Sequence, residues 1–286
     1  MNFKDITHTA ISLLKSDLKA DLNSNSLEKD LTSQSIINKN SKIKVSIVAK
    51  DEIMLCGITF IKKFIHSIEP KIKVEKNYKD GDLIYKNQVI AVLTGNSRKI
   101  MAIERTVLNF LQHLSSVSTS TYRISRMVKS KKTRILDTRK TITGLRSLQK
   151  YATFVGGAKN HRFGLYDQVL IKDNHIEICG GIEKVLQILK SKKIKNYKIE
   201  CDTLNQVKKC IDYGSRYILL DNMNVEKIKK CMNIKGRNKV IFEITGGINE
   251  KNISLYSKLN PDFISIGSIT QNPKAVDISM DIIKKL

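Results

Sequence analysis

Residues 137–175 concentrate cationic side chains between two predicted strands. The stretch reads DTRKTITGLRSLQKYATFVGGAKNHRFGLYDQVLIKDNH, and its basic residues are Arg139, Lys140, Arg146, Lys159, His161, Arg162 and Lys172. These residues adjoin strand ends and glycines. The planar guanidinium group of arginine binds carboxylate and phosphate oxygens in pairs. The pattern therefore favours a pocket for a ligand with several carboxylate or phosphate groups over a merely basic helix surface.

Two glycine-containing segments indicate phosphate binding. In FEITGGINEKN, Gly246 and Gly247 follow a predicted strand, and in FISIGSITQNP, Gly267 and Ser268 follow the final one. Backbone N–H groups at the start of a helix bind anions, and the loops after the last strands of a β/α barrel often hold phosphate. Each pair alone could be an ordinary tight turn, but their occurrence after successive strands favours a phosphate site.

Two carboxylates lie near the ends of consecutive predicted strands. Glu200 and Asp221 could bind Mg²⁺ through oxygen ligands or face a developing positive charge. They could equally form structural ion pairs with nearby lysines. The residue types alone do not separate these alternatives.

The composition is strongly basic, with 51 Lys and Arg against 27 Asp and Glu and a formal net charge of +24. Such a charge attracts polyanions or anionic substrates, although a lysine-rich solvated surface is the favoured explanation for most of the lysines. The five cysteines form no CxxC pair, which indicates a reducing compartment without disulfides or a zinc site. The sequence also lacks a signal peptide and any long apolar run, so a cytoplasmic, non-membrane protein is expected.

Strands and helices that alternate after residue 133 would position these groups. The predicted strands are TRIL (133–136), QVLI (168–171), KIEC (198–201), YILL (217–220), KVIF (239–242) and FISI (263–266). Helices are predicted at about 181–192, 203–213, 224–233, 249–259 and 273–285. This alternation predicts parallel β/α units whose active site lies at the carboxyl ends of the strands. A doubly wound open sheet would use the same edge, but no GxGxxG motif supports a dinucleotide fold.

The first part of the chain predicts a smaller α+β unit. An amphipathic helix is expected over 3–20, a loop over 21–40 and a strand over 42–50. A helix over 53–66, strands at 72–77 and 88–94, and a long helix from about residue 99 follow.

Six strings together resemble the quinolinate phosphoribosyltransferases, the carboxylating nicotinate-nucleotide pyrophosphorylases of NAD synthesis. They are ERTVLNFLQHLS, ILDTRKTITGLRSLQKYA, GGAKNHRFGLYDQVLIKDNH, IECDTLNQ, LLDNM and FEITGGI. The resemblance implies an N-terminal α/β sandwich domain (1–112), an open, incomplete TIM-like β/α barrel (113–270) and a C-terminal helix (271–286) that packs back on the first domain. It also implies a homodimer in which Arg105 of one subunit reaches the site of the other, with larger assemblies left open.

The resemblance further implies the reaction and the residues that carry it. Quinolinate would take a phosphoribosyl group from 5-phosphoribosyl 1-diphosphate and lose CO₂, giving nicotinate mononucleotide and diphosphate with the help of Mg²⁺. The matching positions make Lys140, Glu200 and Asp221 catalytic, with Glu200 and Asp221 also facing the metal. The matching substrate-binding residues are Arg105, Asp137, Thr138, Arg139, His161, Arg162, Lys172, Thr245, Gly246, Gly247, Gly267, Ser268 and Ile269.

A few positions depart from the family pattern. Ile142 and Thr143 replace the usual Thr-Pro, Thr245 replaces Ser, and Gln271 stands where His is common. Two alternatives remain: a paralogue of the same fold associated with molybdenum uptake, and a non-catalytic protein that binds RNA or another polyanion. Because aromatic residues make up only 6% of the chain and no RNA-binding aromatic string occurs, no nucleic-acid partner is expected.

Overall fold

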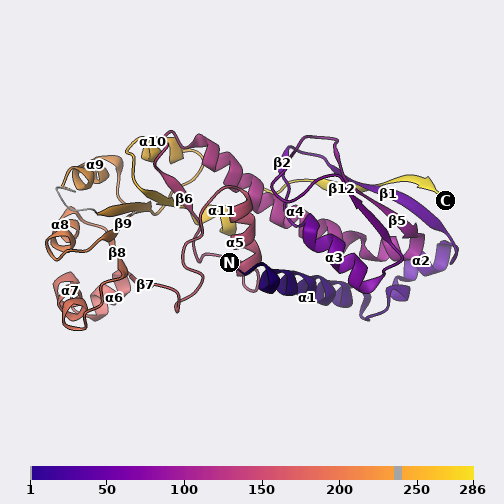
Figure 1. Cartoon of the computed structure of the whole chain (residues 1–286), viewed down its shortest axis with the longest axis horizontal. Coiled ribbons are helices and arrows are strands. Elements are labelled where there is room, and N and C mark those ends of the chain that lie inside the picture. Colours follow the sequence, from indigo (N-terminus) through magenta and orange to yellow (C-terminus); the bar gives the residue numbers. More distant parts are fainter. Residues whose placement is uncertain (1, 235–239) are drawn as a thin grey trace. The chain divides into compact units, whose positions relative to one another are not determined.

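The computed structural model describes residues 2–234 and 240–286 and resolves the chain into two compact units (Figure 1). The first unit comprises residues 1–122, 147–156 and 273–286, and the second comprises 123–146 and 157–272. Each unit is therefore assembled from separate stretches of chain. None of the helices in the described part combines the length and apolar character that crossing a membrane requires.

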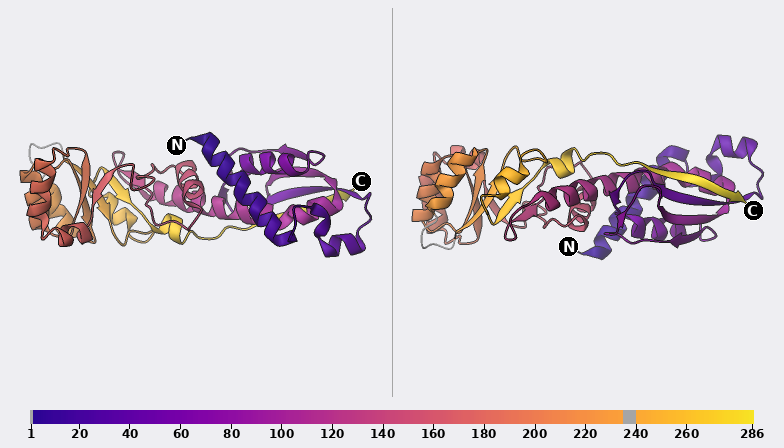
Figure 2. Two further views of the ribbon diagram at one scale, coloured as in Figure 1. Left: turned by 90° about the horizontal axis from the view of Figure 1, so that it is seen from below. Right: turned by 90° about the horizontal axis from the view of Figure 1, so that it is seen from above.

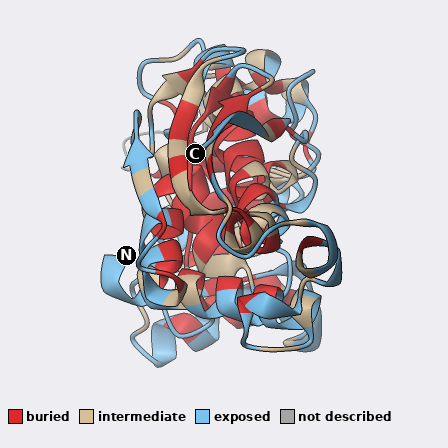
Figure 3. Ribbon diagram, turned by 90° about the vertical axis from the view of Figure 1, so that its right-hand side faces the viewer, coloured by how far each residue is buried: buried red, intermediate tan, exposed pale blue. Residues whose placement is uncertain are grey.

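The first unit is built on a four-stranded antiparallel sheet. Across the sheet its strands are β12 (Ile278–Lys285), β1 (Lys42–Ala49), β5 (Val89–Asn96) and β3 (Lys73–Lys76). The other elements with residues in this unit are α1 (Phe3–Leu22), η1 (Leu27–Lys29), α2 (Leu31–Ile36), β2 (Ile53–Met54), α3 (Ile58–Ile68), β4 (Leu83–Ile84), α4 (Ser97–Met127) and α5 (Arg146–Val155). In α3, Phe60, Ile61 and Phe64 form one fully buried face. Figure 3 shows in red how buried residues gather on the strands and on the inner sides of the helices of this unit.

The prediction of a C-terminal helix over 271–286 is wrong. The segment ISMDIIKK forms β12, which pairs antiparallel with β1 from Ala49 opposite Ile278 to Ile43 opposite Lys285 (Figure 2). β-Branched isoleucines suit an extended strand, and the edge of β1 offers backbone partners that a helix would leave unused. The expected loop at 21–40 is also partly wrong, because it contains η1 and α2. The Asp30 side chain caps α2 by accepting the backbone N–H of Ser33 at 3.1 Å.

The second unit carries a six-stranded, all-parallel sheet, which confirms the predicted α/β fold class. In order across the sheet its strands are β6 (Arg134–Leu136), β11 (Phe263–Ser265), β10 (Ile241–Thr245), β9 (Tyr217–Asp221), β8 (Tyr197–Cys201) and β7 (Val169–Ile171). β6 and β7 occupy opposite edges, so the sheet formed by the described residues is open. Lys239 of the predicted strand 239–242 lies outside the described residues.

Helices connect these strands and bury their apolar faces against the sheet. They are α6 (Asp173–Ile178), α7 (Ile182–Ser191), α8 (Leu204–Asp212), α9 (Val225–Asn233), α10 (Ile253–Ser257) and α11 (Ser268–Gln271). Local sequence determines where α8 begins, because Thr203 and Gln206 exchange side-chain and backbone hydrogen bonds in a capping box. Since all six strands run in one direction, their carboxyl ends meet at one edge of the sheet.

Candidate active site

A cavity of about 610 Å³ opens at the carboxyl edge of the parallel sheet. Thirteen of the predicted site residues line it, and they come from the loops and ends of all six strands. They are Thr138, Arg139, Lys140, His161, Arg162, Lys172, Glu200, Asp221, Thr245, Gly246, Gly247, Gly267 and Ser268. The tertiary fold therefore brings together the cationic stretch, the paired carboxylates and both glycine segments within a single unit.

Asp137 and Ile269, which were also predicted to bind substrate, support the cavity and are not among the residues that line it. Asp137 is fully buried, and its carboxylate accepts the backbone N–H of His161 at 2.8 Å and the amide of Asn160 at 2.7 Å. Asp137 thus ties the loop that carries His161 to the end of β6. The Ile269 side chain packs in the apolar core of the same unit.

Arg105 lies on α4 in the first unit, where 75% of its side chain is exposed. Its nearest acidic partner is Glu104, with Arg105 Nη2 3.8 Å from Glu104 Oε1. The structure leaves the predicted role of Arg105 in a neighbouring subunit untested.

Two arginines present buried donors. The Nε atoms of Arg139 and Arg162 are buried and have no hydrogen-bond partner in the described part of the chain. Arg162 is held by one bond from Nη1 to the carbonyl oxygen of Gln168 at 2.8 Å. Burial, and then the positive charge of Arg139, lower the pKa of Arg162 below its ordinary value. An acidic ligand would supply acceptor oxygens for these two donors. Binding is favoured because a buried donor without an acceptor is costly.

His161 differs from these arginines because both of its ring nitrogens already contact protein groups. Its Nδ1 accepts the backbone N–H of Arg162 at 2.9 Å, and its Nε2 lies 3.4 Å from Oε1 of Glu243. The ring is also almost fully buried. His161 is therefore better placed to position Arg162 than to bind a ligand directly.

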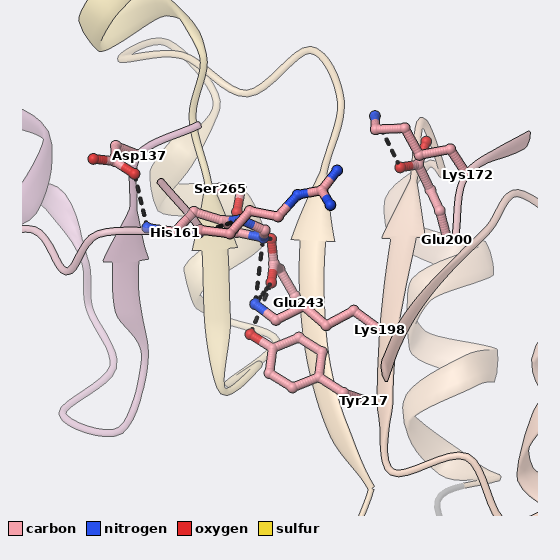
Figure 4. Close-up of polar contacts among 9 residues, drawn as sticks. Asp137, His161, Lys172, Lys198, Glu200, Tyr217, Glu243 and Ser265 are labelled. Carbon is pink, nitrogen blue, oxygen red and sulfur yellow. Dashed lines mark hydrogen bonds and ion pairs between the residues drawn. The ribbon is translucent and has the colours of Figure 1, made fainter. Parts of the chain in front are cut away.

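The paired carboxylates Glu200 and Asp221 lie at the ends of β8 and β9. Figure 4 shows Glu200 beside Lys172. Lys172 Nζ lies 3.4 Å from Glu200 Oε2. Burial raises the pKa of Glu200; Lys172 opposes the rise, and the negative charge of Asp221 adds to it. Asn222 donates from Nδ2 to Asp221 Oδ2 at 2.7 Å and so orients that carboxylate toward the cavity.

The glycine segments shape the opposite wall of the cavity. Gly246 has a φ of +87°, and a Cβ there would lie 2.7 Å from the backbone nitrogen of Asn222 and closer still to the Asn222 side chain. Only glycine fits this position without strain. The hydroxyl of Thr270 donates to the carbonyl oxygen of Lys140 at 2.7 Å, which joins the loop after β11 to the loop after β6.

The sequence did not single out several residues that line the cavity. They are Leu170, Leu219, Asn222, Glu243, Ile248 and Ser265. Asn222 belongs to the LLDNM string, so the family resemblance could have identified it as a site residue. Glu243 is a single charged residue inside an apolar strand, and no sequence pattern marks it as a site residue. Gln271, which departs from the family pattern, and Asn249 also line the cavity.

The fold and the cavity define an α/β enzyme whose site is built to hold several acidic groups at once. The models of the N-terminal and C-terminal domains of quinolinate phosphoribosyl transferase match residues 30–115 and 117–281. The chain belongs to the quinolinate phosphoribosyltransferase family.

Curated relatives and solved structures agree with this assignment. A probable carboxylating nicotinate-nucleotide pyrophosphorylase of Methanocaldococcus jannaschii is 39% identical over 284 residues, covering 96% of this chain and 98% of the relative. Its counterpart in Bacillus subtilis is 36% identical, with 88% of each chain covered. The nicotinate-nucleotide pyrophosphorylase structures of Francisella tularensis (34% identical, 96% of each chain) and Ehrlichia chaffeensis (35%, 99% of each chain) both superpose with a TM-score of 0.87.

Proposed function

We propose that the cavity of the second unit binds quinolinate beside 5-phosphoribosyl 1-diphosphate and joins them with loss of CO₂. Quinolinate phosphoribosyl transfer is the activity of this family in de novo NAD synthesis. The observation that carries the proposal is the pair of buried Nε donors of Arg139 and Arg162, which have no hydrogen-bond partner among the described residues, in a cavity that Lys140 and Lys172 also line. Quinolinate has two carboxylates, and such donors bind them with geometric selectivity.

The two substrates divide the cavity by its chemistry. Arg139, Arg162 and Lys172 would hold the quinolinate carboxylates. The 5-phosphate would lie against the loops at 245–247 and 267–268, whose glycines would let backbone N–H groups approach it. Glu200 and Asp221 would accept hydrogen bonds from the ribose hydroxyls, and Lys140 would face the diphosphate.

The reaction then follows from positioning and charge complementarity. The pyridine nitrogen attacks the anomeric carbon, a C–N bond forms, and the C–O bond to diphosphate breaks with its electron pair on the leaving group. Glu200 and Asp221 stabilise positive charge that develops on the ribose, while Lys140 stabilises negative charge on the diphosphate. The ring nitrogen becomes cationic and stabilises the electron pair left on the adjacent carbon when CO₂ departs. That carbon finally takes a proton.

Mg²⁺ fits this site as a companion of the diphosphate. Mg²⁺ is commonly bound through one or two carboxylates together with substrate phosphates, and Glu200 and Asp221 supply such oxygens. Among the described residues, no group of three or more His, Cys, Asp or Glu side chains assembles into a metal site by itself. When bound, the ion would neutralise charge on the departing diphosphate.

The active form is proposed to be a homodimer in which Arg105 completes the quinolinate site of the partner subunit. The exposed Arg105 side chain supports this, because it is available to a second copy. An Arg105→Ala variant should lose nearly all turnover, as should Lys140→Ala. Mixed dimers of the two variants should regain part of the activity, since one of their two sites is then intact. Absence of rescue in verified mixed dimers would refute the shared site.

A cytoplasmic location is proposed because the cysteines are all free thiols and four of the five are buried. The direct test of function is formation of nicotinate mononucleotide by the purified protein from quinolinate, the phosphoribosyl donor and Mg²⁺. Omission of quinolinate is the matched control. Failure to form product at any Mg²⁺ concentration would reject the proposal, and salt-sensitive binding of RNA without turnover would favour a polyanion-binding protein instead.

A further inference from the structure

At the floor of the cavity, a cluster of buried and half-buried polar side chains crosses the parallel sheet. Lys198, Tyr217, Glu243 and Ser265 come from four neighbouring strands, β8, β9, β10 and β11 (Figure 4). Glu243 is fully buried, and only 7% of the Lys198 side chain is exposed. Four neighbouring strands thus place polar groups at one point of an otherwise apolar sheet.

Glu243 is the centre of this cluster. Its Oε2 accepts the Tyr217 hydroxyl at 2.8 Å and lies 3.4 Å from Lys198 Nζ, and its Oε1 accepts the Ser265 hydroxyl. The Lys198 ammonium also lies 4.0 Å from the centre of the Tyr217 ring, within the range of a cation–π contact. A buried carboxylate needs this degree of compensation, because desolvation of an unpaired charge is very costly.

Glu243 and Ser265 line the cavity themselves, and His161 connects the cluster to Arg162. The remaining contact of Glu243 Oε1 is His161 Nε2, at 3.4 Å. Because His161 Nδ1 accepts the Arg162 N–H, Nδ1 carries no proton, and a neutral ring has its hydrogen on Nε2. Nε2 lies 3.3 Å from Lys198 Nζ and 3.4 Å from Glu243 Oε1. Since an ammonium group only donates, Glu243 is the acceptor for this hydrogen. A continuous path therefore runs from Glu243 through the His161 ring to the backbone of Arg162.

We propose that Glu243, with Lys198, Tyr217 and Ser265, is a positioning cluster that fixes the tautomer and orientation of His161 and thereby places Arg162 in the quinolinate subsite. This inference rests on the proposed function. The buried ammonium and carboxylate balance each other, so the cluster orients His161 without adding net negative charge beneath a cavity that must bind anions. A lone carboxylate at this position would instead compete with quinolinate for the arginines.

A pair of tyrosine variants tests the cluster with little risk to the fold. Tyr217→Phe removes one hydrogen bond to Glu243, whereas Tyr197→Phe removes a matched bond of 2.8 Å to Ser215, outside the cluster. We expect Tyr217→Phe to raise the KM for quinolinate about threefold to tenfold and to leave the KM for the phosphoribosyl donor unchanged. Tyr197→Phe should change neither KM. The inference fails if Tyr217→Phe matches Tyr197→Phe, or if both KM values rise equally.

Charge variants address Glu243 itself. Glu243→Gln leaves the buried Lys198 ammonium without its counter-ion and should lower the unfolding temperature. The double variant Lys198→Met/Glu243→Gln removes both charges and should recover part of that loss. It should nevertheless keep a raised quinolinate KM, because His161 has lost its ionised acceptor. A folded double variant with the parent KM for quinolinate would overturn the inference.

The tautomer provides a readout that does not depend on turnover. Long-range ¹H–¹⁵N spectra of the parent, with the signal assigned by comparison with His161→Gln, should show that the neutral form of the ring is protonated on Nε2. A neutral form protonated on Nδ1 would refute the positioning cluster even if the enzyme were active. An inactive parent with the expected tautomer would instead count against the proposed function alone.

Discussion

Replacement of Arg162 by lysine tests whether its guanidinium geometry, rather than its charge, binds quinolinate. Arg162 Nη1 is bound to the Gln168 carbonyl oxygen, and its buried Nε has no partner among the described residues. The edge formed by Nε and Nη2 can therefore donate two parallel hydrogen bonds to a carboxylate. Lysine keeps the charge but offers a single point donor in place of this fork.

The expected magnitude follows from the loss of one charge-assisted hydrogen bond. Such a bond contributes about 1.5–3 kcal/mol, which corresponds to a roughly tenfold to 150-fold decrease in kcat/KM for quinolinate. Initial rates at saturating phosphoribosyl donor would measure it, while the KM for the donor should stay within about twofold. Arg216→Lys, an exposed arginine before β9, provides the matched control and should behave as the parent. An unchanged quinolinate kcat/KM in Arg162→Lys would refute the fork at this position.

Three further predictions concern the frame of the site. Gly246→Ala should lower activity and thermal stability more than Gly214→Ala. Both residues have a left-handed backbone, but only at Gly246 would a Cβ collide with Asn222. Equal losses in the two variants would contradict this reasoning. Asp137→Ala should lower the free energy of unfolding in urea by about 3 kcal/mol, because the buried backbone N–H of His161 and the half-buried side-chain amide of Asn160 lose their acceptor. A loss near zero would show that other groups or water replace it. Burial alone would raise the pKa of Glu243, but the hydrogen bond and charge of His161, the charge of Lys198 and the hydrogen bond from Ser265 hold it at about 2, below the ordinary 4.5. A depressed carboxyl pKa stabilises the fold above pH 4.5 and loses that contribution as the pH falls toward 2, so Glu243→Gln should flatten the acid loss of stability in denaturation measured across this range.

Local pattern was sufficient to predict the parallel strands between residues 133 and 266 and most of the helices that connect them. Each strand is a short apolar run, and each charged or glycine residue that follows it falls at the same edge once the strands run parallel. That rule placed Arg139, Lys172 and Asp221 correctly around one cavity. The family resemblance depended on strings of adjacent residues, which are also a property of the sequence alone.

Pairing between distant segments was decided only by the tertiary structure. The segment ISMDIIKK forms a strand because an open strand edge lies beside it. That edge belongs to β1, which lies more than two hundred residues earlier in the chain. Similarly, Asp137 reads as a ligand by its position after a strand, yet the loop carrying His161 folds over it and uses its carboxylate as an acceptor.

The cluster around Glu243 shows the same limit most clearly. A single Lys198 or Glu243 within a strand has no local partner, and the free energy of burying it depends on groups supplied by other strands. The sequence by itself determined which segments form strands and which charges follow them. Only the packed sheet decided which of those charges meet, because electrostatic and hydrogen-bonding energies fall steeply with distances that are set by the tertiary fold.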